Sequence, residues 1–401
     1  MIKRINKIEK FLKAKKSLLI LGPRGSGKTY YIKILSKSMG LNFFYIDLLE
    51  TDTYRKYLIS PSLLRKEIEF KMQSMNILYI FIDEIQKIPA LFSEIHKIIE
   101  DYKKKCIFIL TGSSARKLKS KNVDLLSGRA LYIPFFPFNL QEIDFNLNLL
   151  KILQFGTLPD AFLEEDIEIV IEYLKTYTHL YLKEEILQES IVRNIEGFGR
   201  FLELAAFVNG SPVNFTKMSR QIGISSKTIK EYFQILEDTL LIHRIPAWTY
   251  SIKKQIQKSS KYFFFDNGLL NSLKGELKTE LKESSYRFGH LFENMVINEI
   301  IKVNTLNNYD YKLYHYRTNH NLEIDLIVQK NINTTPIAVE IKSSISPDYK
   351  DVKSLFDIKA DYPDAKLVCI CRCQEPYQDE GILFLPFVQG IKEIFNEPIG
   401  Q

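Results

Sequence analysis

Residues 22–29 read GPRGSGKT and directly follow the apolar run SLLIL at residues 17–21. Only 17 of the 401 residues are glycine, yet three of them lie in this stretch, at positions 22, 25 and 27. The apolar run has the composition of a buried strand, and TYYIKILSKSMG at residues 29–40 has the apolar spacing of a helix. The stretch is therefore predicted to be a glycine-rich loop that joins a strand to a helix.

This loop has the pattern GxxxxGK[ST] of the P-loop, in which successive backbone N–H groups face a phosphate. We expect Lys28 to reach the β- and γ-phosphates and the Thr29 hydroxyl to coordinate Mg²⁺. ATP and Mg²⁺ are the cofactors that this pattern predicts. The residues expected to hold the nucleotide are Gly22, Pro23, Arg24, Gly25, Ser26, Gly27, Lys28 and Thr29.

A second apolar run, ILYIFIDEIQ at residues 77–86, contains the acidic pair Asp83-Glu84 after its apolar part. A continuous apolar run is typical of a strand that is buried on both faces of a parallel sheet. An acidic pair after a strand is commonly only a helix cap, but its combination with a P-loop favours a Walker B motif. Asp83 is then expected in the Mg²⁺ shell, and Glu84 is expected to polarise the attacking water.

Two further side chains are candidates for catalysis. The run CIFILTGSS at residues 106–114 predicts a third strand with a polar end from Thr111 to Ser114. If this strand lies between the two Walker strands, a hydroxyl of its polar end can sense the γ-phosphate or orient the water, and Ser113 is the candidate. Arg129 precedes another strand-like run, in LLSGRALYIPFFPF at residues 125–138, and can touch the γ-phosphate in its own chain or in a neighbouring subunit. The alternatives are a strand-ending turn for Ser113 and a surface arginine for Arg129.

The length of 401 residues exceeds one ordinary core and predicts two or three domains. The composition, 45% hydrophobic and 26% charged, is that of a soluble globular protein. No apolar run approaches the roughly 18–20 residues of a membrane span. The run SLLIL is too short for a signal peptide and has no cleavage site after it. We expect a cytoplasmic protein without a membrane partner.

The net charge of +7 is unevenly distributed, because residues 1–40 hold eleven Lys and Arg and one acid, a balance of +10 that leaves −3 for the rest. Any contact with nucleic acid must therefore be local.

The four cysteines are Cys106 and the three of CICRC at residues 369–373, which alternate along a strand-like run and so share a face. Reduced structural thiols are favoured over a metal site, because no second cluster or CxxC spacing accompanies them.

The stretches GPRGSGKT, FIDEIQ, TGSSARKL and LSGRA together resemble the AAA-superfamily ATPases of bacteria and archaea whose Walker B motif reads Asp-Glu-Ile-Gln. The resemblance implies a P-loop ATPase joined to a winged-helix segment and then to a C-terminal domain like the PD-(D/E)XK nucleases. One departure is GTLP, where a double glycine is more usual before the proline. The resemblance covers nearly the whole chain, through FGTLPDAF (155–162), LLIHRIPAW (240–248), KYFFFDNGLL (261–270), GHLFENMVINEI (289–300), YRTNHNLEIDLIV (316–328) and AVEIKSS (338–344).

Residues 214–239, NFTKMSRQIGISSKTIKEYFQILEDT, predict two helices joined by a tight turn. Asn214 can cap a first helix that ends at Gly223, and Ser225 or Ser226 can cap the second. Two helices joined in this way are the signature of a helix-turn-helix. The apolar stripe of the second helix consists of Ile229, Phe233 and Leu236.

A hairpin of LLIHRIPAW with KYFFFD is expected to follow, and SIKKQIQKSSK at residues 251–261, between its strands, has four lysines and no acid. In one interpretation this winged helix grips nucleic-acid phosphates through lysines of the second helix and of the loop. In the other it is a lid or docking module, and the lysines are solvated. The candidates for phosphate contact are Lys227, Lys230, Lys253, Lys254 and Lys258, with Lys261 as the fourth lysine of the loop.

The C-terminal third predicts the element order of a restriction-endonuclease-like core. Asp325 lies in an otherwise apolar strand, and Glu340 and Lys342 are two residues apart, so both project from one face of their strand. Asp325 and Glu340 can hold Mg²⁺, with Glu293 as a further ligand and Lys342 beside the water. An ion pair between Glu340 and Lys342 is the alternative. The predicted elements are a helix at 287–303, strands at 311–317, 322–329 and 337–344, a helix near 348–360 and a strand at 366–371.

We therefore predict an α/β protein in which the catalytic residues for Mg²⁺-dependent ATP hydrolysis are Lys28, Glu84, Ser113 and Arg129. The predicted function is ATP-controlled action on DNA or RNA. The alternative is an ATP-dependent switch that binds a protein partner, with the C-terminal domain as a non-catalytic docking module, and either can involve a homo-oligomer. The predicted parts are a parallel-sheet P-loop ATPase at 1–150, a helical and winged-helix region at 151–270 and a nuclease-like α/β domain at 271–401.

Overall fold

The computed structural model describes residues 2–41, 43–114, 126, 128–143, 149–181, 195–249, 258–317, 323–331, 333–360 and 362–395. Two compact units make up the chain. The first consists of Met1–Ile143 with Gln234–Leu241, and the second consists of Asp144–Phe233 with Ile242–Gln401. Among the described residues, no helix combines the length and the apolar composition that crossing a bilayer requires.

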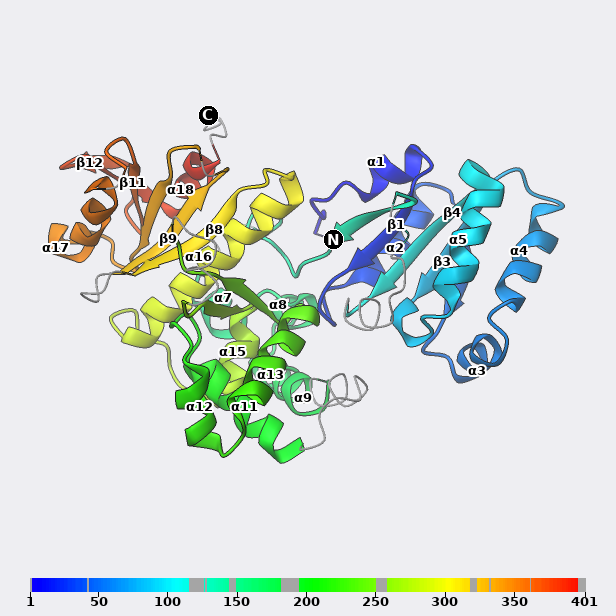
Figure 1. The fold of residues 1–401 in the computed structure, drawn as a ribbon, viewed down its shortest axis with the longest axis horizontal. Helices are drawn as coiled ribbons and strands as arrows, with labels where there is room; N and C mark the ends of the chain where they lie inside the picture. The colour runs from blue at the N-terminus through cyan, green and yellow to red at the C-terminus, as the bar shows by residue number, and fades with distance from the viewer. Residues whose placement is uncertain are drawn as a thin grey trace. The chain divides into compact units, whose positions relative to one another are not determined.

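A five-stranded parallel sheet forms the centre of the first unit, shown in blue to cyan in Figure 1. The strand order is β2-β3-β4-β1-β5. Strand β4 thus lies between the strands that precede the P-loop and the acidic pair, and this confirms the placement on which the role of Ser113 depends. The strands are β1 (Ser17–Leu21), β2 (Phe43–Asp47), β3 (Leu78–Asp83), β4 (Cys106–Gly112) and β5 (Ala130–Pro134).

Helices pack on both faces of this sheet, because successive strand residues alternate between two apolar clusters. Leu19 and Ile80 belong to the cluster that contains Ile95 of α5, whereas Leu18 belongs to the cluster that contains Ile32 of α2. Burial on both faces explains why the strands read as continuous apolar runs. The helices are α1 (Ile8–Lys13), α2 (Lys28–Ser38), α3 (Thr51–Ile59), α4 (Leu63–Met72) and α5 (Leu91–Tyr102), with 3₁₀ turns at Ile85–Lys87 and Lys103–Lys105.

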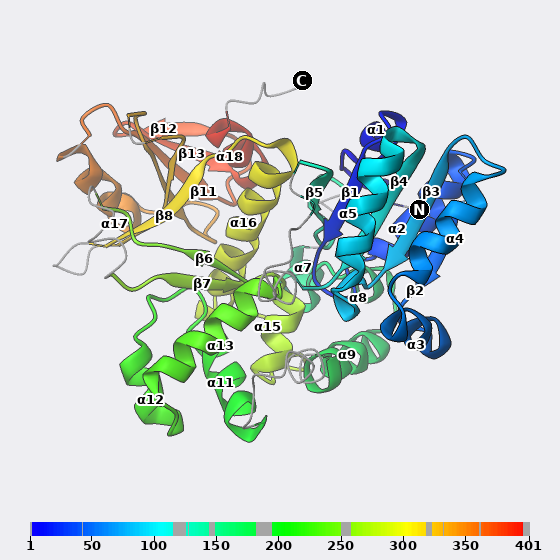
Figure 2. The ribbon, with the colours of Figure 1, turned by 45° about the vertical axis from the view of Figure 1, so that its right-hand side comes forward.

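The second unit begins with a helical region that contains the predicted helix-turn-helix and hairpin, in green in Figure 2. The antiparallel strands β6 and β7 pair Ile242 with Phe264. The elements are α7 (Leu149–Phe155), α8 (Pro159–Leu163), α9 (Ile167–Thr176) with a π-helical turn at Tyr177–Tyr181, α11 (Ile195–Phe207), α12 (Phe215–Ile222), α13 (Ser226–Asp238), β6 (Ile242–Ile245), β7 (Lys261–Phe264) and α15 (Asn267–Leu273). The end of α13, from Gln234 on, is grouped with the first unit.

The predicted caps of the helix-turn-helix are confirmed. The Asn214 side chain accepts a hydrogen bond from the Lys217 N–H at 2.9 Å, and Gly223 ends α12 in the left-handed conformation at φ 71°. Ser225 Oγ accepts a hydrogen bond from the Thr228 N–H at 3.1 Å before α13. The predicted apolar stripe is buried, at Ile229, Phe233 and Leu236.

Two motifs of the helical region, FGTLP and DNGLL, contact each other through a buried carboxylate. Asp266 accepts hydrogen bonds from the backbone N–H groups of Thr157 at 2.6 Å and Gly268 at 2.9 Å, and so caps α15. Gly156 has φ +75°, and a Cβ there would collide with the Asp266 carboxylate. The glycine and the aspartate are therefore required together by packing, which gives both motifs a structural role.

A mixed six-stranded sheet completes the second unit, in the order β12-β13-β11-β10-β9-β8. Strands β10, β11 and β13 are parallel, and β8, β9 and β12 are antiparallel to their neighbours. The predicted order of a helix, three strands, a helix and a strand is present, but the sequence did not predict β12, β13 and α18. The elements are α16 (Tyr286–Asn307), β8 (Lys312–Arg317), β9 (Glu323–Gln329), β10 (Ile337–Ile341), α17 (Tyr349–Val352) with a 3₁₀ stretch at Lys353–Ala360, β11 (Lys366–Cys371), β12 (Tyr377–Asp379), β13 (Ile382–Pro386) and α18 (Phe387–Ile394).

The cysteines contribute to packing. All four are buried free thiols. Cys369, Cys371 and Cys373 belong to one apolar cluster of the mixed sheet, which confirms that they share a face. Burial raises the pKa of the Cys106 thiol to about 12, which disfavours its reactive thiolate.

Candidate functional site

The P-loop lies between the carboxyl end of β1 and the amino end of α2, as predicted. Gly25 and Gly27 have φ angles of 74° and 88°, in the region that a side chain with a Cβ adopts only with strain. Gly22 is constrained differently, because a Cβ there would collide with the carbonyl oxygen of Phe135. The three glycines therefore allow a curled backbone and a close approach of the segment after β5.

Lys28 lies inside the loop and is 5% exposed. Its ammonium donates hydrogen bonds to the carbonyl oxygens of Gly22 at 2.8 Å and Pro23 at 3.0 Å. A phosphate in the loop would offer this ammonium charged acceptors in place of neutral ones, and charge-assisted hydrogen bonds are stronger. The position of Lys28 fits the phosphate-binding role expected of it.

Asp83 is 2% exposed and is held by hydroxyl groups. Its Oδ2 accepts a hydrogen bond from Thr29 Oγ1 at 2.7 Å, and its Oδ1 accepts one from Thr111 Oγ1. The pair predicted to coordinate Mg²⁺, Thr29 and Asp83, is thus brought together from α2 and β3. A hydroxyl and a carboxylate are hard oxygen ligands of the kind Mg²⁺ takes from proteins, so these residues fit the ion. Thr111 belongs to the polar end of β4 that the sequence places at this site, but its contact with Asp83 was not predicted.

Glu84 has a left-handed backbone, with φ 57° and ψ 45°, which is uncommon for a residue other than glycine. Its Oε2 accepts hydrogen bonds from Gln86 Nε2 and, at 3.4 Å, from Ser113 Oγ. Gln86 Nε2 also donates to Ser113 Oγ at 3.0 Å. Gln86 is part of the motif FIDEIQ but had no predicted role, whereas in the structure it bridges Glu84 and Ser113, the two predicted catalytic side chains.

The prediction that Arg129 touches the γ-phosphate of its own chain is wrong. Strands β1 and β5 are parallel with Ser17 opposite Ala130, so Arg129 lies at the amino end of β1, whereas the P-loop follows the carboxyl end. A five-residue strand spans roughly 13 Å. Arg129 instead pairs with Glu100 at the end of α5. A contact with a neighbouring subunit stays a prediction.

A cluster of carboxylates and lysines lies in the second unit. Asp325 of β9 and Glu340 of β10 are on neighbouring strands, and Asp325 Oδ2 accepts a hydrogen bond from the Ile341 N–H at 2.8 Å. The Lys342 ammonium lies 2.8 Å from Glu340 Oε1, so these two side chains share a face. Burial and the neighbouring Asp325 carboxylate raise the pKa of Glu340 to about 8.

Lys261 is not a solvated loop lysine, contrary to the sequence interpretation. It is 1% exposed, and its ammonium lies 2.6 Å from Glu323 Oε1 and 3.7 Å from Glu293 Oε1. Burial alone would lower the pKa of Lys261, but Glu293, Asp325 and Glu323 outweigh it and the pKa is raised. Lys261 therefore neutralises acids beneath the hairpin and does not contact phosphate.

The expectation that Glu293 joins Asp325 and Glu340 as a third metal ligand is not met. Within the described parts of the chain, no group of three or more His, Cys, Asp and Glu side chains is arranged to hold a metal ion. Burial, followed by the Asp325 carboxylate, raises the pKa of Glu293 to about 7. Glu293 contacts Lys261 instead, which leaves Asp325 and Glu340 as the candidate pair.

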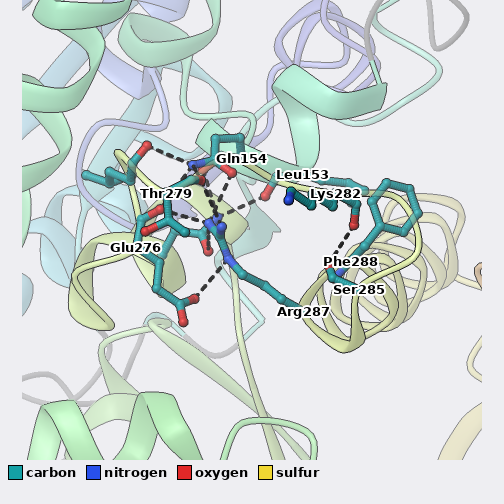
Figure 3. A network of polar contacts seen from close by, with 10 residues as sticks. Leu153, Gln154, Glu276, Thr279, Lys282, Ser285, Arg287 and Phe288 are labelled. Atoms are coloured by element: carbon teal, nitrogen blue, oxygen red, sulfur yellow. Dashed lines mark hydrogen bonds and ion pairs between the residues drawn. The ribbon is translucent and has the colours of Figure 1, made fainter.

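The first turn of α16 is fixed by the polar network in Figure 3. The Arg287 guanidinium donates to the carbonyl oxygens of Thr279 and Glu276 at 2.9 Å, and to side-chain oxygens of Gln154 at 3.0 Å and Asn271 at 3.1 Å. Its Nε lies 3.0 Å from the Glu276 carboxylate. This arginine ties α16, which carries Glu293 two turns further on, to α7 and α15.

The predicted nucleic-acid lysines are only partly described. Lys227, Lys230 and Lys258 are exposed. Lys253 and Lys254 lie outside the described residues. The three exposed lysines are accessible to a phosphate, and their role in binding nucleic acid stays a prediction.

Comparison with known families agrees with the geometry of the first unit. Residues 14–144 match the model of an AAA domain. Residues 146–280 and 288–389 match two domains of unknown function, DUF8612 and DUF4143. The chain therefore has an N-terminal P-loop ATPase domain of the AAA type, as the resemblance implied. The winged-helix and nuclease-like assignments and the predicted boundaries stay predictions.

Two bacterial proteins with similar sequences are named as uncharacterised. An uncharacterised protein of Mycobacterium tuberculosis is 23% identical over 330 residues, which cover 82% of this chain and 71% of that protein. An uncharacterised protein of Haemophilus influenzae is 25% identical over 265 residues, which cover 59% of this chain and 60% of that protein. Among solved structures, Cdc6p from Pyrobaculum aerophilum aligns over 65% of this chain and 86% of its own, with 14% identity and a TM-score of 0.26.

Proposed function

We propose that the protein is a Mg²⁺-dependent ATPase whose nucleotide state controls metal-dependent action on nucleic acid. In the first unit, Lys28 binds the β- and γ-phosphates, and Thr29 with Asp83 holds Mg²⁺. The ion, when bound, neutralises phosphate charge. Glu84 accepts a proton from the attacking water, and its hydrogen bonds with Gln86 and Ser113 keep the carboxylate oriented toward that task.

The observation that carries the second half of the proposal is the unpaired oxygen of Glu340. Its side chain is 6% exposed, and its Oε2 has no hydrogen-bond partner among the described residues. Glu340 Oε1 is paired with Lys342, but a buried acceptor such as Oε2 that is left without a hydrogen bond costs about 1–3 kcal/mol. A divalent cation between Glu340 and Asp325 would offset that cost, and Lys342 would then lie beside a metal-bound water.

The fold around this pair supports nucleic acid as the substrate. The helix-turn-helix and hairpin resemble a winged helix, and exposed lysines stand at the start of α13 and before β7. Strand β7 also supplies Lys261, whose ammonium contacts Glu323 of β9, the strand that carries Asp325. A nucleic acid bound to the β6–β7 hairpin would therefore contact an element whose Lys261 reaches the strand of Asp325.

The test incubates the protein with ATP, Mg²⁺ or Mn²⁺ and a panel of labelled single- and double-stranded DNA and RNA. Wild type should cleave at least one polymer in an ATP-dependent manner. Lys28→Ala should remove the ATP dependence, and Asp325→Ala should remove cleavage while ATP hydrolysis continues. Absence of cleavage of every polymer with both metals would refute the nuclease half of the proposal.

A protein-binding switch is the second candidate, and Lys261 is the observation that favours it. Its ammonium neutralises Glu293 and Glu323 without any metal, so the cluster is partly satisfied as a structural ion-pair network. In that case the second unit is a docking module whose partner affinity follows the nucleotide. ATP hydrolysis without any nucleic-acid cleavage or binding is the result that this candidate predicts.

A further inference from the structure

Arg4, in the segment before α1, contacts the P-loop at Ser26. Its Nη1 donates a hydrogen bond to the carbonyl oxygen of Ser26 at 3.2 Å, and its Nη2 donates one to the carbonyl oxygen of Phe136 at 2.5 Å. Its Nε lies 3.1 Å from Glu142 Oε1. All three arms of the guanidinium are used, and one of them reaches a residue of the phosphate-binding loop.

The surroundings hold this guanidinium in one place. The side chains of Arg4 and Glu142 are 9% and 2% exposed. The Arg4 Cζ lies 4.5 Å from the ring centroid of Phe135 and 5.0 Å from that of Phe138. Glu142 also accepts hydrogen bonds from the backbone N–H groups of Ile5 at 2.5 Å and Asn139 at 3.1 Å. The planar guanidinium of Arg4 has few alternative orientations among these partners, so it restrains the carbonyl groups of Ser26 and Phe136.

The contact with Ser26 determines the direction of the next peptide group. In a planar trans peptide the carbonyl oxygen and the following N–H point in opposite directions. Because the Ser26 carbonyl points to Arg4, the Gly27 N–H is directed away from Arg4. Gly27 is also the N-cap of α2, with φ 88°. Its N–H is thus one of the donors that a bound phosphate needs.

The segment after β5 fixes the other end of the loop. The Phe135 N–H donates to the Leu21 carbonyl at 2.8 Å, and the Phe135 carbonyl packs against Gly22. Arg4 stacks on the Phe135 ring and bonds the Phe136 carbonyl, so it is linked to both ends of the loop. A buried ion pair contributes little net stability because its desolvation is costly. Stability alone therefore does not account for a buried Arg4–Glu142 pair in contact with the phosphate-binding loop.

We infer that Arg4 is a positioning residue for the nucleotide, which holds the P-loop backbone in its phosphate-binding conformation. The inference rests on the ATPase half of the proposed function. Without Arg4 the Ser26 carbonyl loses this hydrogen bond, so the Ser26–Gly27 peptide is less restrained and ATP binding must then also order it. That ordering cost appears as weaker binding by the folded protein, and not only as lower stability.

The test measures the Kd of ATP with Mg²⁺ by titration calorimetry, together with the thermal midpoint, for the full chain and four variants. Arg4→Met removes the hydrogen bonds and the ion pair of the guanidinium and should weaken ATP binding about 5- to 30-fold. Arg4→Lys keeps the charge but not the fork, and it should weaken binding about threefold to tenfold. Arg65→Met removes a half-buried, ion-paired arginine of α4 that does not contact the P-loop, and it should leave Kd unchanged.

Glu142→Gln separates positioning from stability. It removes the charge partner while Arg4 keeps its acceptors at Ser26 and Phe136, so the thermal midpoint should fall while Kd changes less than twofold. Wild-type affinity in both Arg4 variants would overturn the inference. The inference would also fail if Arg4→Met and Glu142→Gln lost ATP affinity in the same proportion to their loss of thermal stability, because Arg4 would then act on binding only through stability. Failure of the wild type itself to bind ATP would instead refute the proposed ATPase function.

Discussion

Glu340→Gln perturbs the carboxylate cluster at its least satisfied atom. Glu340 has one oxygen on Lys342 and one without a described partner, and burial with the Asp325 charge raises its pKa from 4.5 to about 8. An acid whose pKa is raised by folding binds more protons in the folded than in the unfolded protein. Stability of the metal-free protein should therefore fall as pH rises from about 4.5 to about 8.

The magnitude follows from the size of the shift. At 1.36 kcal/mol per pKa unit, the difference between 4.5 and about 8 corresponds to on the order of 5 kcal/mol. Glu340→Gln removes this penalty, so it should stabilise the metal-free protein by a few kcal/mol at pH 9 and by almost nothing at pH 4.5. Glu293, whose pKa is raised to about 7, faces the same cluster with Lys261 and should leave a smaller pH dependence in the variant.

The assay is thermal unfolding of the full chain without nucleotide, in EDTA and in Mn²⁺, across this pH range. In a Lys28→Ala background, where nucleotide-site metal does not interfere, Glu340→Gln should raise the midpoint at pH 9 by roughly 6–12 °C in EDTA, for about 3 kcal/mol. Mn²⁺ should stabilise the protein with Glu340 and not the variant.

The matched control for this assay is Glu299→Gln. Glu299 is 3% exposed and lies 3.5 Å from the Lys302 ammonium, so its loss leaves a buried charge without this partner and should destabilise at every pH. If Glu340→Gln behaves like this control, or if Mn²⁺ stabilises it as much as wild type, the metal site is refuted.

Three further predictions concern other parts of the chain. Charge reversal of Lys227, Lys230 and Lys258 should make the dependence of log K on log salt shallower by about three units for duplex DNA, measured by fluorescence anisotropy, and an unchanged slope would exclude them from the interface. Lys261→Met should destabilise the second unit by about 3–5 kcal/mol in urea denaturation, because it leaves buried acids without their cation, and a neutral effect would contradict the ion-pair network. Gly27→Ala should weaken ATP binding and lower stability by about 1 kcal/mol, since φ 88° is strained for alanine, and wild-type affinity by calorimetry would rule this out.

The parts of the fold that could be predicted from the sequence are those that depend on short local patterns. The P-loop, the strand before Asp83 and the caps at Asn214 and Ser225 each depend on a few neighbouring residues, and these appear as predicted. The pair Glu340 and Lys342 likewise follows from the period of a strand. Short-range chemistry leaves a signal in the sequence that can be interpreted directly.

The errors come from relations between distant segments. The parallel pairing of β5 with β1 puts Arg129 at the amino end of β1, away from the P-loop of its own chain, and no local sequence motif predicts this pairing. Lys261 looks like a loop lysine because its partners, Glu293 and Glu323, come from later segments. Arg4 has no motif at all, since its acceptors are backbone carbonyls, which every residue has. No single-sequence pattern encodes such contacts.

Steady-state ATP hydrolysis by wild type and Glu84→Gln, with ATP affinity measured on the same samples, tests the ATPase most directly. The glutamine keeps the shape and can still accept from Gln86, but it cannot take a proton from water. The variant should bind ATP with unchanged Kd and turn over about 10²- to 10⁴-fold more slowly, while Glu94→Gln on α5 should behave as wild type. Wild-type turnover in Glu84→Gln, or no hydrolysis by wild type in Mg²⁺, would contradict the proposed mechanism.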